Sequence, residues 1–225
     1  MNVNLINYMG SDLSVVNAAR VSFAKESELE WVKREDSPTM YKQTLNEKDK
    51  KLISYLAKHN HWSPFAHTFL SFRIEAPIFV ARQLVKHQIG LVWNEESRRY
   101  IDSPPTLHKI KQWREKPKNS KQGSGDQIVI DNQLFNEVQA HNQNSLYLYN
   151  KLIQANVAPE QARSVLPLNT YTNWIWSGTL YAFHRVCKLR LDDHAQKETR
   201  DIARALDVCC KDAFPISWKY LMNET

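Results

Sequence analysis

The most constraining feature of this sequence is a stretch of strict alternation that runs directly into a helical pattern. Between positions 70 and 76 apolar and polar side chains alternate, which places one set on each face of an extended strand. The apolar set is Leu70, Phe72, Ile74 and Ala76, and the polar set is Ser71, Arg73 and Glu75. Pro77 then suits the first turn of a helix that we expect to end near Gly90. A half-buried strand that feeds a helix is a common place for a functional site.

Capping residues and helical spacing predict further helices on both sides of this strand. Ser11 can cap a helix that carries Leu13 and Val16, and Asn46 can cap a second one that carries Leu52 and Leu56. The remaining expected elements are a long helix spanning about 134–153, a short helix from Pro159 to Arg163, a strand over 170–176, and two closing helices, one through 180–189 and one from about His194 through Leu206.

The order of these elements predicts a mixed α/β (α+β) fold, with a sheet flanked by helices. The 225 residues fit a single domain, because one hydrophobic core serves chains up to about 250 residues. Residues 103–126 are rich in Lys, Pro, Ser and Gly and lack periodicity, so we expect a surface insertion there. No Gly-x-Gly-x-x-Gly motif follows a predicted strand, which argues against a Rossmann domain.

Charge and cysteine content exclude few classes of partner and few cellular compartments. A net charge of +6 and a pI near 9.1 suit phosphate-bearing partners. The three cysteines, Cys187, Cys209 and Cys210, form no visible disulfide framework. Neither a signal peptide nor an apolar run of transmembrane length is evident, so we expect a cytoplasmic protein, or one in the host cytoplasm if the source is a virus.

The densest polar cluster follows the helix that Pro77 opens. It comprises Lys86, His87 and Gln88, and then the run from Asn94 to Tyr100, which reads Asn-Glu-Glu-Ser-Arg-Arg-Tyr. Arginine offers a planar donor fork to phosphate, serine adds a neutral donor, and carboxylates accept from ribose hydroxyls. A nucleotide would satisfy all three kinds of group, whereas the plain alternative is a solvated charged loop.

Four blocks in register make the nucleotide interpretation more specific. The cluster resembles the signature of flavin-dependent thymidylate synthases, in which an Arg-His-Arg triplet precedes an Asn-Glu-x-Ser-x-Arg-Tyr block. The stretches from His61 to His67, from Ala162 to Pro167 and from Leu189 to Gln196 resemble the same family in order and approximate spacing. The resemblance extends from about Asn17 to Leu206.

The resemblance implies a fold, a reaction and a set of partners. Members of the family have an antiparallel sheet flanked by helices and bind FAD without a Rossmann fold, across the subunits of a homotetramer. They convert dUMP into dTMP, with 5,10-methylenetetrahydrofolate as the carbon donor and FAD, reduced by NADPH, as the hydride source. We therefore expect these cofactors and partners here, and neither a metal, a membrane nor nucleic acid.

The resemblance also assigns residues. Arg190 matches the arginine placed at the uracil ring, where a fixed positive charge favours ionisation at N3, and is the expected catalytic residue. The expected dUMP-binding residues are Gln83, Lys86, Glu95, Glu96, Ser97, Arg98, Arg99, Arg163 and Arg190. The expected FAD-binding residues are Ser63, Lys86, His87, Gln88, Glu95, Thr179, Leu180, Tyr181 and Arg185, with His61, Asn94 and Tyr100 as secondary candidates.

The sequence departs from the family pattern inside the signature itself. Lys86 and Gln88 stand where the family has its two arginines, and the stretch from His87 to Ser97 is one residue longer. Ser97 lacks a nucleophile elbow, so we assign it to substrate binding. The cysteines lack the Pro-Cys motif of ordinary thymidylate synthases, and we expect all three to be buried in helices.

Two other functions remain open at this stage. A metal-dependent hydrolase would use His59, His61 and His67 with Asp192, Asp193, His194 and Glu198, of which His194 and Glu198 would share one helix face. A nucleic-acid-binding module would use the lysines at 109, 111, 116, 118 and 121 together with the seven tryptophans, which are more often core residues.

Overall fold

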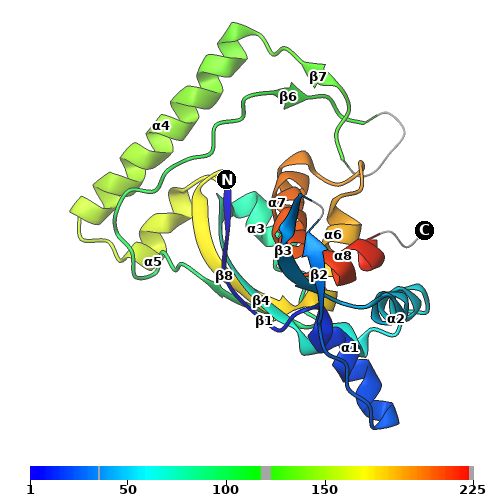
Figure 1. Cartoon of the computed structure of the whole chain (residues 1–225). Helices are drawn as coiled ribbons and strands as arrows, with labels where there is room; N and C mark the ends of the chain where they lie inside the picture. The colour runs from blue at the N-terminus through cyan, green and yellow to red at the C-terminus, as the bar shows by residue number, and fades with distance from the viewer. Residues whose placement is uncertain (35, 118–122, 223–225) are drawn as a thin grey trace.

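The computed structural model describes residues 1–34, 36–117 and 123–222. A four-stranded antiparallel sheet lies at its centre (Figure 1). Its strands lie in the order β1 (Asn2–Met9), β4 (Phe69–Pro77), β8 (Tyr171–Thr179) and β5 (Leu91–Glu95). Every pairing in this sheet is antiparallel, unlike the parallel sheet of a Rossmann domain. The predicted mixed fold with an antiparallel sheet is therefore confirmed.

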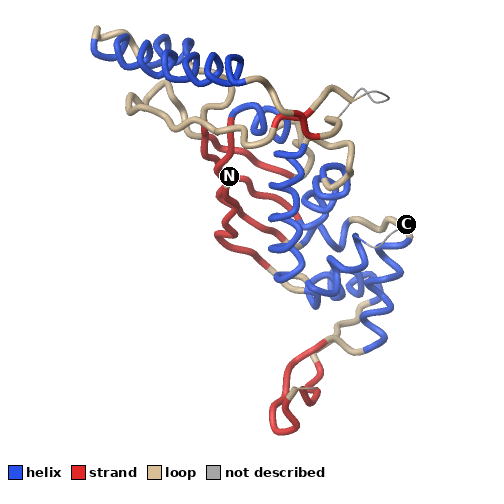
Figure 2. The backbone as a smooth tube through the Cα atoms, turned by 90° about the horizontal axis from the view of Figure 1, so that it is seen from above, coloured by secondary structure: helices blue, strands red, loops and turns tan. Residues whose placement is uncertain are grey.

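The alternation in β4 decides which face of the sheet is covered. Leu70, Phe72, Ile74 and Ala76 are fully buried, as predicted, and Phe72 and Ile74 pair with Trp176 and Trp174 of β8. The covering helices all lie on this face (Figure 2). They include α3 (Ile78–Leu84), α6 (Leu180–Arg190) and α7 (Lys197–Ala213). Ser71, Arg73 and Glu75 lie on the other face, where the hydroxyls of Ser71 and Ser177 are 2.8 Å apart.

The N-terminal helices pack beside the last helix of the described chain. Ser11 is the N-cap residue of helix α1 (Asp12–Arg20), and Asn46 is that of α2 (Glu47–Lys58), as predicted. The side chain of Asn46 accepts from the backbone N–H of Asp49. Short 3-10 turns, η1 (Val21–Phe23) and η2 (Ser63–His67), follow these helices. The last helix, α8 (Pro215–Met222), is not in the prediction, which has two closing helices instead of three.

Asp12 joins the two ends of the chain. Its carboxylate is 8 % exposed and accepts from the backbone N–H groups of Ile216, at 3.0 Å, and Ser217, at 2.7 Å, in the first turn of α8. We expect Asp12→Ala to lower the free energy of unfolding by about 2–3 kcal/mol, because two buried donors lose their acceptor. Urea denaturation measures this change.

Asp131 provides a matched control for this prediction. It accepts from the N–H of Leu134 in the first turn of α4 (Asn132–Gln154), but it is solvent-exposed. Asp131→Ala should therefore cost about 1 kcal/mol or less, since water can replace the lost acceptor. Equal losses in the two variants would contradict the role given to Asp12.

Two peripheral units extend from the sheet and its helices. The hairpin of β2 (Glu30–Arg34) and β3 (Ser37–Thr44) projects from the body (Figure 2). The predicted long helix is α4 (Asn132–Gln154), which runs along one side of the molecule (Figure 1). The predicted short helix is α5 (Pro159–Ala162), followed by η3 (Arg163–Val165). None of the helices in the described ranges has the length and apolar composition needed to cross a bilayer.

The expected surface insertion at 103–126 is more structured than predicted in its described part. Strand β6 (Trp113–Arg114) pairs with β7 (Gln127–Ile128), and Leu107 forms a bridge with Thr170. Arg114 also binds Glu198 of α7 at 2.7 Å. Part of this stretch is therefore fixed to the sheet and to a helix, through contacts that no local sequence pattern indicates.

Two predicted helix boundaries are wrong. Helix α3 ends at Leu84 instead of near Gly90, because the chain turns back to form β5, a strand that the prediction lacks. Helix α7 begins at Lys197 instead of His194, since residues 191–196 form turns in which Asp192 accepts from the backbone N–H of His194. Both corrections lie next to candidate site residues.

Candidate active site

The turn between α3 and β5 presents the first group of candidate residues. Gly90 adopts a φ of +76°, a conformation that glycine takes without a steric cost, and its carbonyl accepts from the N–H of Thr179. Gly178 of β8 permits this close approach, because a Cβ atom there would lie 2.3 Å from the Gly90 oxygen. Lys86, His87 and Gln88 are thereby held beside α6.

His87 and Arg190 meet in this region, although they are 103 residues apart in sequence. Arg190 is the last residue of α6, and its Nε donates to Nε2 of His87 at 2.9 Å. Burial and, to a lesser extent, the charges of Arg190 and Arg185 lower the pKa of His87 to about 4. His87 is therefore neutral near pH 7, as an acceptor from a guanidinium must be.

A pocket of about 560 Å³ opens beside this pair. The turn contributes Lys86, His87, Gln88 and Ile89, β5 contributes Leu91, and α6 contributes Ala182, Arg185, Lys188 and Leu189. Three cations thus stand beside an apolar wall, a combination that suits a ligand with both a phosphate and a flat ring system. Lys188 is not among the predicted site residues. It lies three residues after Arg185, so the two side chains share one face of the helix, and this spacing could have identified it.

Two histidines, the partly buried His87 and the buried His184, make stability depend on pH. Burial also lowers the pKa of His184, on α6, to about 4. Unfolded histidine binds a proton below its ordinary pKa of 6.5, whereas these two remain neutral in the folded protein down to about pH 4. The contribution of these two histidines to the free energy of unfolding is therefore fully present above pH 6.5. It is lost as the pH falls from 6.5 to 4. The Tm measured across that range should fall, and less steeply in His184→Phe; an unchanged slope in the variant would contradict the assignment.

Glu95, the last residue of β5, and the following Glu96 are held against β8. Glu95 accepts from the Thr172 hydroxyl at 2.8 Å and from the Trp93 indole N–H at 3.1 Å. Glu96 donates its backbone N–H to the carbonyl of Asn173 at 2.8 Å. These contacts fix the beginning of the run from 94 to 100, which is therefore not the freely solvated loop of the plain alternative.

The two arginines of this run have different surroundings. Arg98 donates to the carbonyl of Ser103 at 2.6 Å and lies 3.5 Å from Glu96. Arg99 is exposed, donates through Nε to Ser97 Oγ at 3.2 Å and lies over the ring of Tyr100. Arg99 therefore keeps donors that face solvent, whereas Arg98 also stabilises the local backbone.

The other candidates lie elsewhere on the same chain. His61 and Ser63 line a separate pocket of about 830 Å³ that shares no lining residue with the His87 pocket. Thr179 caps α6, with its hydroxyl accepting from the N–H of Ala182, and the adjacent Leu180 is fully buried in the core. The positions not yet mentioned are an exposed Asn94 on β5, a partly buried Gln83 on α3, a partly buried Tyr181 on α6 and an exposed Arg163 on η3.

The residues behind the metal-hydrolase alternative do not gather in the described part of the chain. His194 precedes α7, so it does not share a helix face with Glu198, and no three His, Cys, Asp or Glu side chains of the described residues gather as metal ligands. Cys187 and Cys210 are buried, as expected, whereas Cys209 is only partly buried. Trp174, Trp176 and Trp218 belong to the core, and Lys118 and Lys121 lie outside the described residues.

Comparison with known proteins places this geometry among related chains. The family model Thy1, "Thymidylate synthase complementing protein", matches residues 4–216. A flavin-dependent thymidylate synthase of Thermus thermophilus is 35% identical over 216 residues, which cover 96% of this chain and 73% of the relative. One of Kosmotoga olearia is 35% identical over 225 residues, covering 98% and 90%.

A solved structure is also similar. The UMP/dUMP methylase PolB of Streptomyces cacaoi, bound with 5-Br dUMP, superposes with a TM-score of 0.81 at 26% sequence identity. The superposition covers 99% of this chain and 95% of that one.

Proposed function

Because the chain belongs to the Thy1 family of thymidylate synthase complementing proteins, we infer that it is a flavin-dependent methyltransferase that converts dUMP into dTMP. The observation that carries this inference is the contact between Arg190 and His87 at the edge of a pocket lined by three cations. Two of the four sequence blocks, the signature with His87 and the stretch from Leu189 to Gln196, meet in this contact.

The residues around this pocket fit a flavin dinucleotide. Lys86, Arg185 and Lys188 suit a pyrophosphate, while Ile89, Leu91 and Leu189 suit the ring system. The chemistry that bound FAD supplies is hydride transfer. Lys86 and Gln88 stand where the family has arginines, so one fixed cation is lost, and Lys188 on the same pocket wall supplies another.

We assign the substrate contacts to Arg190 beside this pocket, to the run from 94 to 100 and to Arg163 on η3. Arg190 provides a fixed positive charge that stabilises the uracil ring as its N3 proton leaves and C5 becomes nucleophilic. Arg99 and Arg163 are exposed and bind the phosphate, with Ser97 as a neutral donor. Glu95, held by Thr172 and Trp93, accepts from the deoxyribose hydroxyl.

The balance of the reaction points to two further substrates. Methylation at C5 of uracil requires a one-carbon unit and a hydride. We assign the carbon to 5,10-methylenetetrahydrofolate and the reducing equivalents to NADPH, as the family resemblance implies. The chain as a whole then serves as one catalytic domain.

We also propose a homotetramer with shared active sites. His61 and Ser63 line a different pocket from His87, so one chain does not bring all the candidate residues into one cavity. In addition, Trp31, Met40 and Tyr41 are exposed on the projecting β2–β3 hairpin. An isolated two-stranded hairpin is marginally stable in water, and a second subunit would cover these side chains. Sedimentation velocity measures the assembly.

The first test of the function is an absorption titration of the purified protein. We expect a bound flavin spectrum on addition of FAD, a further shift on addition of dUMP, and dTMP formation when folate and NADPH are supplied. Arg185→Ala should weaken FAD binding, whereas Arg73→Ala, on the open face of the sheet, should not. Failure of the wild-type protein to bind flavin at any concentration would overturn the proposal.

A further inference from the structure

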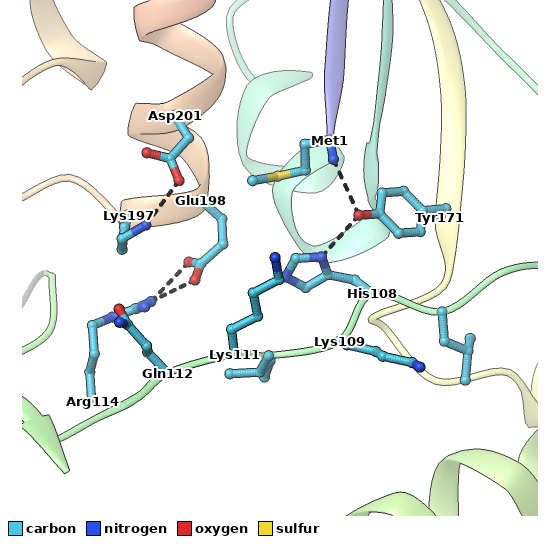
Figure 3. A pocket seen from close by; sticks show the side chains of 12 residues that line it. Met1, His108, Lys109, Lys111, Gln112, Arg114, Tyr171, Lys197, Glu198 and Asp201 are labelled. Atoms are coloured by element: carbon cyan, nitrogen blue, oxygen red, sulfur yellow. Dashed lines mark hydrogen bonds and ion pairs between the residues drawn. The ribbon is translucent and has the colours of Figure 1, made fainter. Parts of the chain in front are cut away.

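A second cationic pocket lies between the 107–114 segment and the beginning of α7 (Figure 3). Its volume is about 620 Å³, within the range of small-molecule sites. None of its lining residues belongs to the His87 pocket, to the pocket with His61, or to the run from 94 to 100. It contains two of the lysines that the proposed function leaves without a role.

The wall of this pocket is fixed at both ends. On one side, the carbonyl of Thr106 accepts from the N–H of Tyr171, and the N–H of His108 donates to the carbonyl of Asn169 at 2.7 Å. On the other side, Arg114 binds both carboxylate oxygens of Glu198, at 2.7 and 3.0 Å. A ligand would therefore meet a preformed surface, which reduces the entropy lost on binding.

The charges in this pocket do not cancel. Arg114 is paired with Glu198, and Lys197 with Asp201 at 3.1 Å. Lys109 and Lys111 form no ion pair with any acidic side chain in the described part of the chain. Figure 3 shows Lys111 reaching toward the ring of His108. The excess positive charge favours an anionic ligand.

Aromatic and apolar groups complete the lining. Nδ1 of His108 and the hydroxyl of Tyr171 are 3.0 Å apart, and their rings meet edge to face. Burial lowers the pKa of His108, so this ring is neutral and presents a flat surface near pH 7. Leu107, Ile110 and the side chain of Met1 add apolar contacts. This combination suits a planar ring that carries an anionic group.

We propose that this pocket is an accessory binding site for an aromatic anion, a small molecule with a planar ring and a phosphate or carboxylate group held by Lys111 and Lys109. Two sources share this chemistry: a nucleotide, and a pteridine with a carboxylate tail. The site is separate from the dUMP and flavin residues, so the proposal does not depend on their assignments.

Pyridoxal 5′-phosphate is a probe of this chemistry, because it is an aromatic phosphate with an aldehyde. A lysine amine condenses with the aldehyde to an imine with loss of one water. Cyanoborohydride then delivers a hydride to the imine carbon while water protonates the nitrogen, which leaves a stable secondary amine. The FAD-loaded protein is labelled at limiting probe, and the modified lysines are mapped by peptide mass spectrometry.

We expect Lys111 or Lys109 to be labelled at least several-fold more than Lys211 and Lys219, which are exposed on α7 and α8. Protection by added dTMP would identify a nucleotide site, and protection by folic acid would identify a pteridine site. Labelling equal to that of Lys211 and Lys219, or labelling that neither competitor reduces at matched ionic strength, would overturn the proposal.

A pair of variants gives a second, independent measurement. Lys111→Gln should reduce labelling of Lys109 roughly tenfold or more, because the probe loses a charge-assisted hydrogen bond. Lys211→Gln removes the same charge from the far end of α7, away from the residues that line the pocket, and should leave labelling of Lys109 unchanged. An equal effect of the two variants would show that only net charge matters and would contradict a defined site.

Discussion

Replacing Arg190 by alanine is expected to lower kcat for dTMP formation by roughly a hundred- to a thousandfold, the usual loss when one preorganised group that stabilises developing charge is removed. The side chain is partly buried and held by His87, so its charge is fixed in place before the substrate binds. The fold and the bound flavin should remain, since the core of α6 consists of other residues. Steady-state kinetics with the flavin spectrum as a parallel readout measures both effects.

Two further variants serve as controls for this prediction. Arg190→Lys keeps a positive charge but loses the planar fork, so it should retain part of the activity. Arg82→Ala removes an exposed arginine from α3 and should leave kcat unchanged. Near-normal turnover in Arg190→Ala would show the catalytic assignment to be wrong.

The same substitution has a consequence for His87 that does not depend on activity. Without the charge of Arg190 the pKa of His87 should rise above its value of about 4, and it should stay below 6.5 because burial is the larger cause of the shift. A proton NMR titration of the histidine rings follows this change. An unchanged His87 titration would show that the two side chains do not interact in solution.

Gly178→Ala is expected to cost roughly 3 kcal/mol of stability and to weaken flavin binding as well. The added Cβ would lie 2.3 Å from the Gly90 oxygen and 2.5 Å from a methyl carbon of Leu91, so β5 and the preceding turn must move away from β8. That movement displaces Lys86, His87 and Gln88 together. Chemical denaturation and FAD titration of the same sample measure the two effects.

Ser177→Ala is the matched control, one residue earlier on the same strand. It loses only the hydrogen bond to Ser71 on the open face, which should cost about 1 kcal/mol or less and leave flavin binding unchanged. If Gly178→Ala matched this control in both measurements, the close approach of Gly90 would have no role in forming the pocket.

Much of the fold was predictable wherever a local pattern is strong. The alternation in β4, the caps at Ser11 and Asn46 and the helical period of α4 all correspond to observed elements. The strands and helices that the prediction lacks include β1, the β2–β3 hairpin, β5, the β6–β7 pair and α8. Strand β1 shows why, because a register shift between Leu5 and Asn7 breaks its alternation, and only its pairing with β4 makes it a strand.

In the candidate site, too, some features follow from local sequence patterns and others only from long-range packing. The family resemblance identified Lys86, His87, Arg185 and Arg190 as candidates, and all of them except Arg185 lie in a block with a chemically distinctive pattern. The resemblance did not indicate Lys188, nor that His87 accepts from Arg190. A contact between side chains 103 residues apart depends on how the α3–β5 turn packs against α6, which no local pattern encodes.

By itself, then, the sequence determined the residue types of the site, the main strand and helix periods, and the family to which the chain belongs. Only the tertiary structure decided where α3 ends, which cations share a pocket, and that Asp12 caps a helix 204 residues away. The physical reason is that periodicity and capping act over a few residues, whereas pockets and long-range caps arise when separate elements exclude water from a common core.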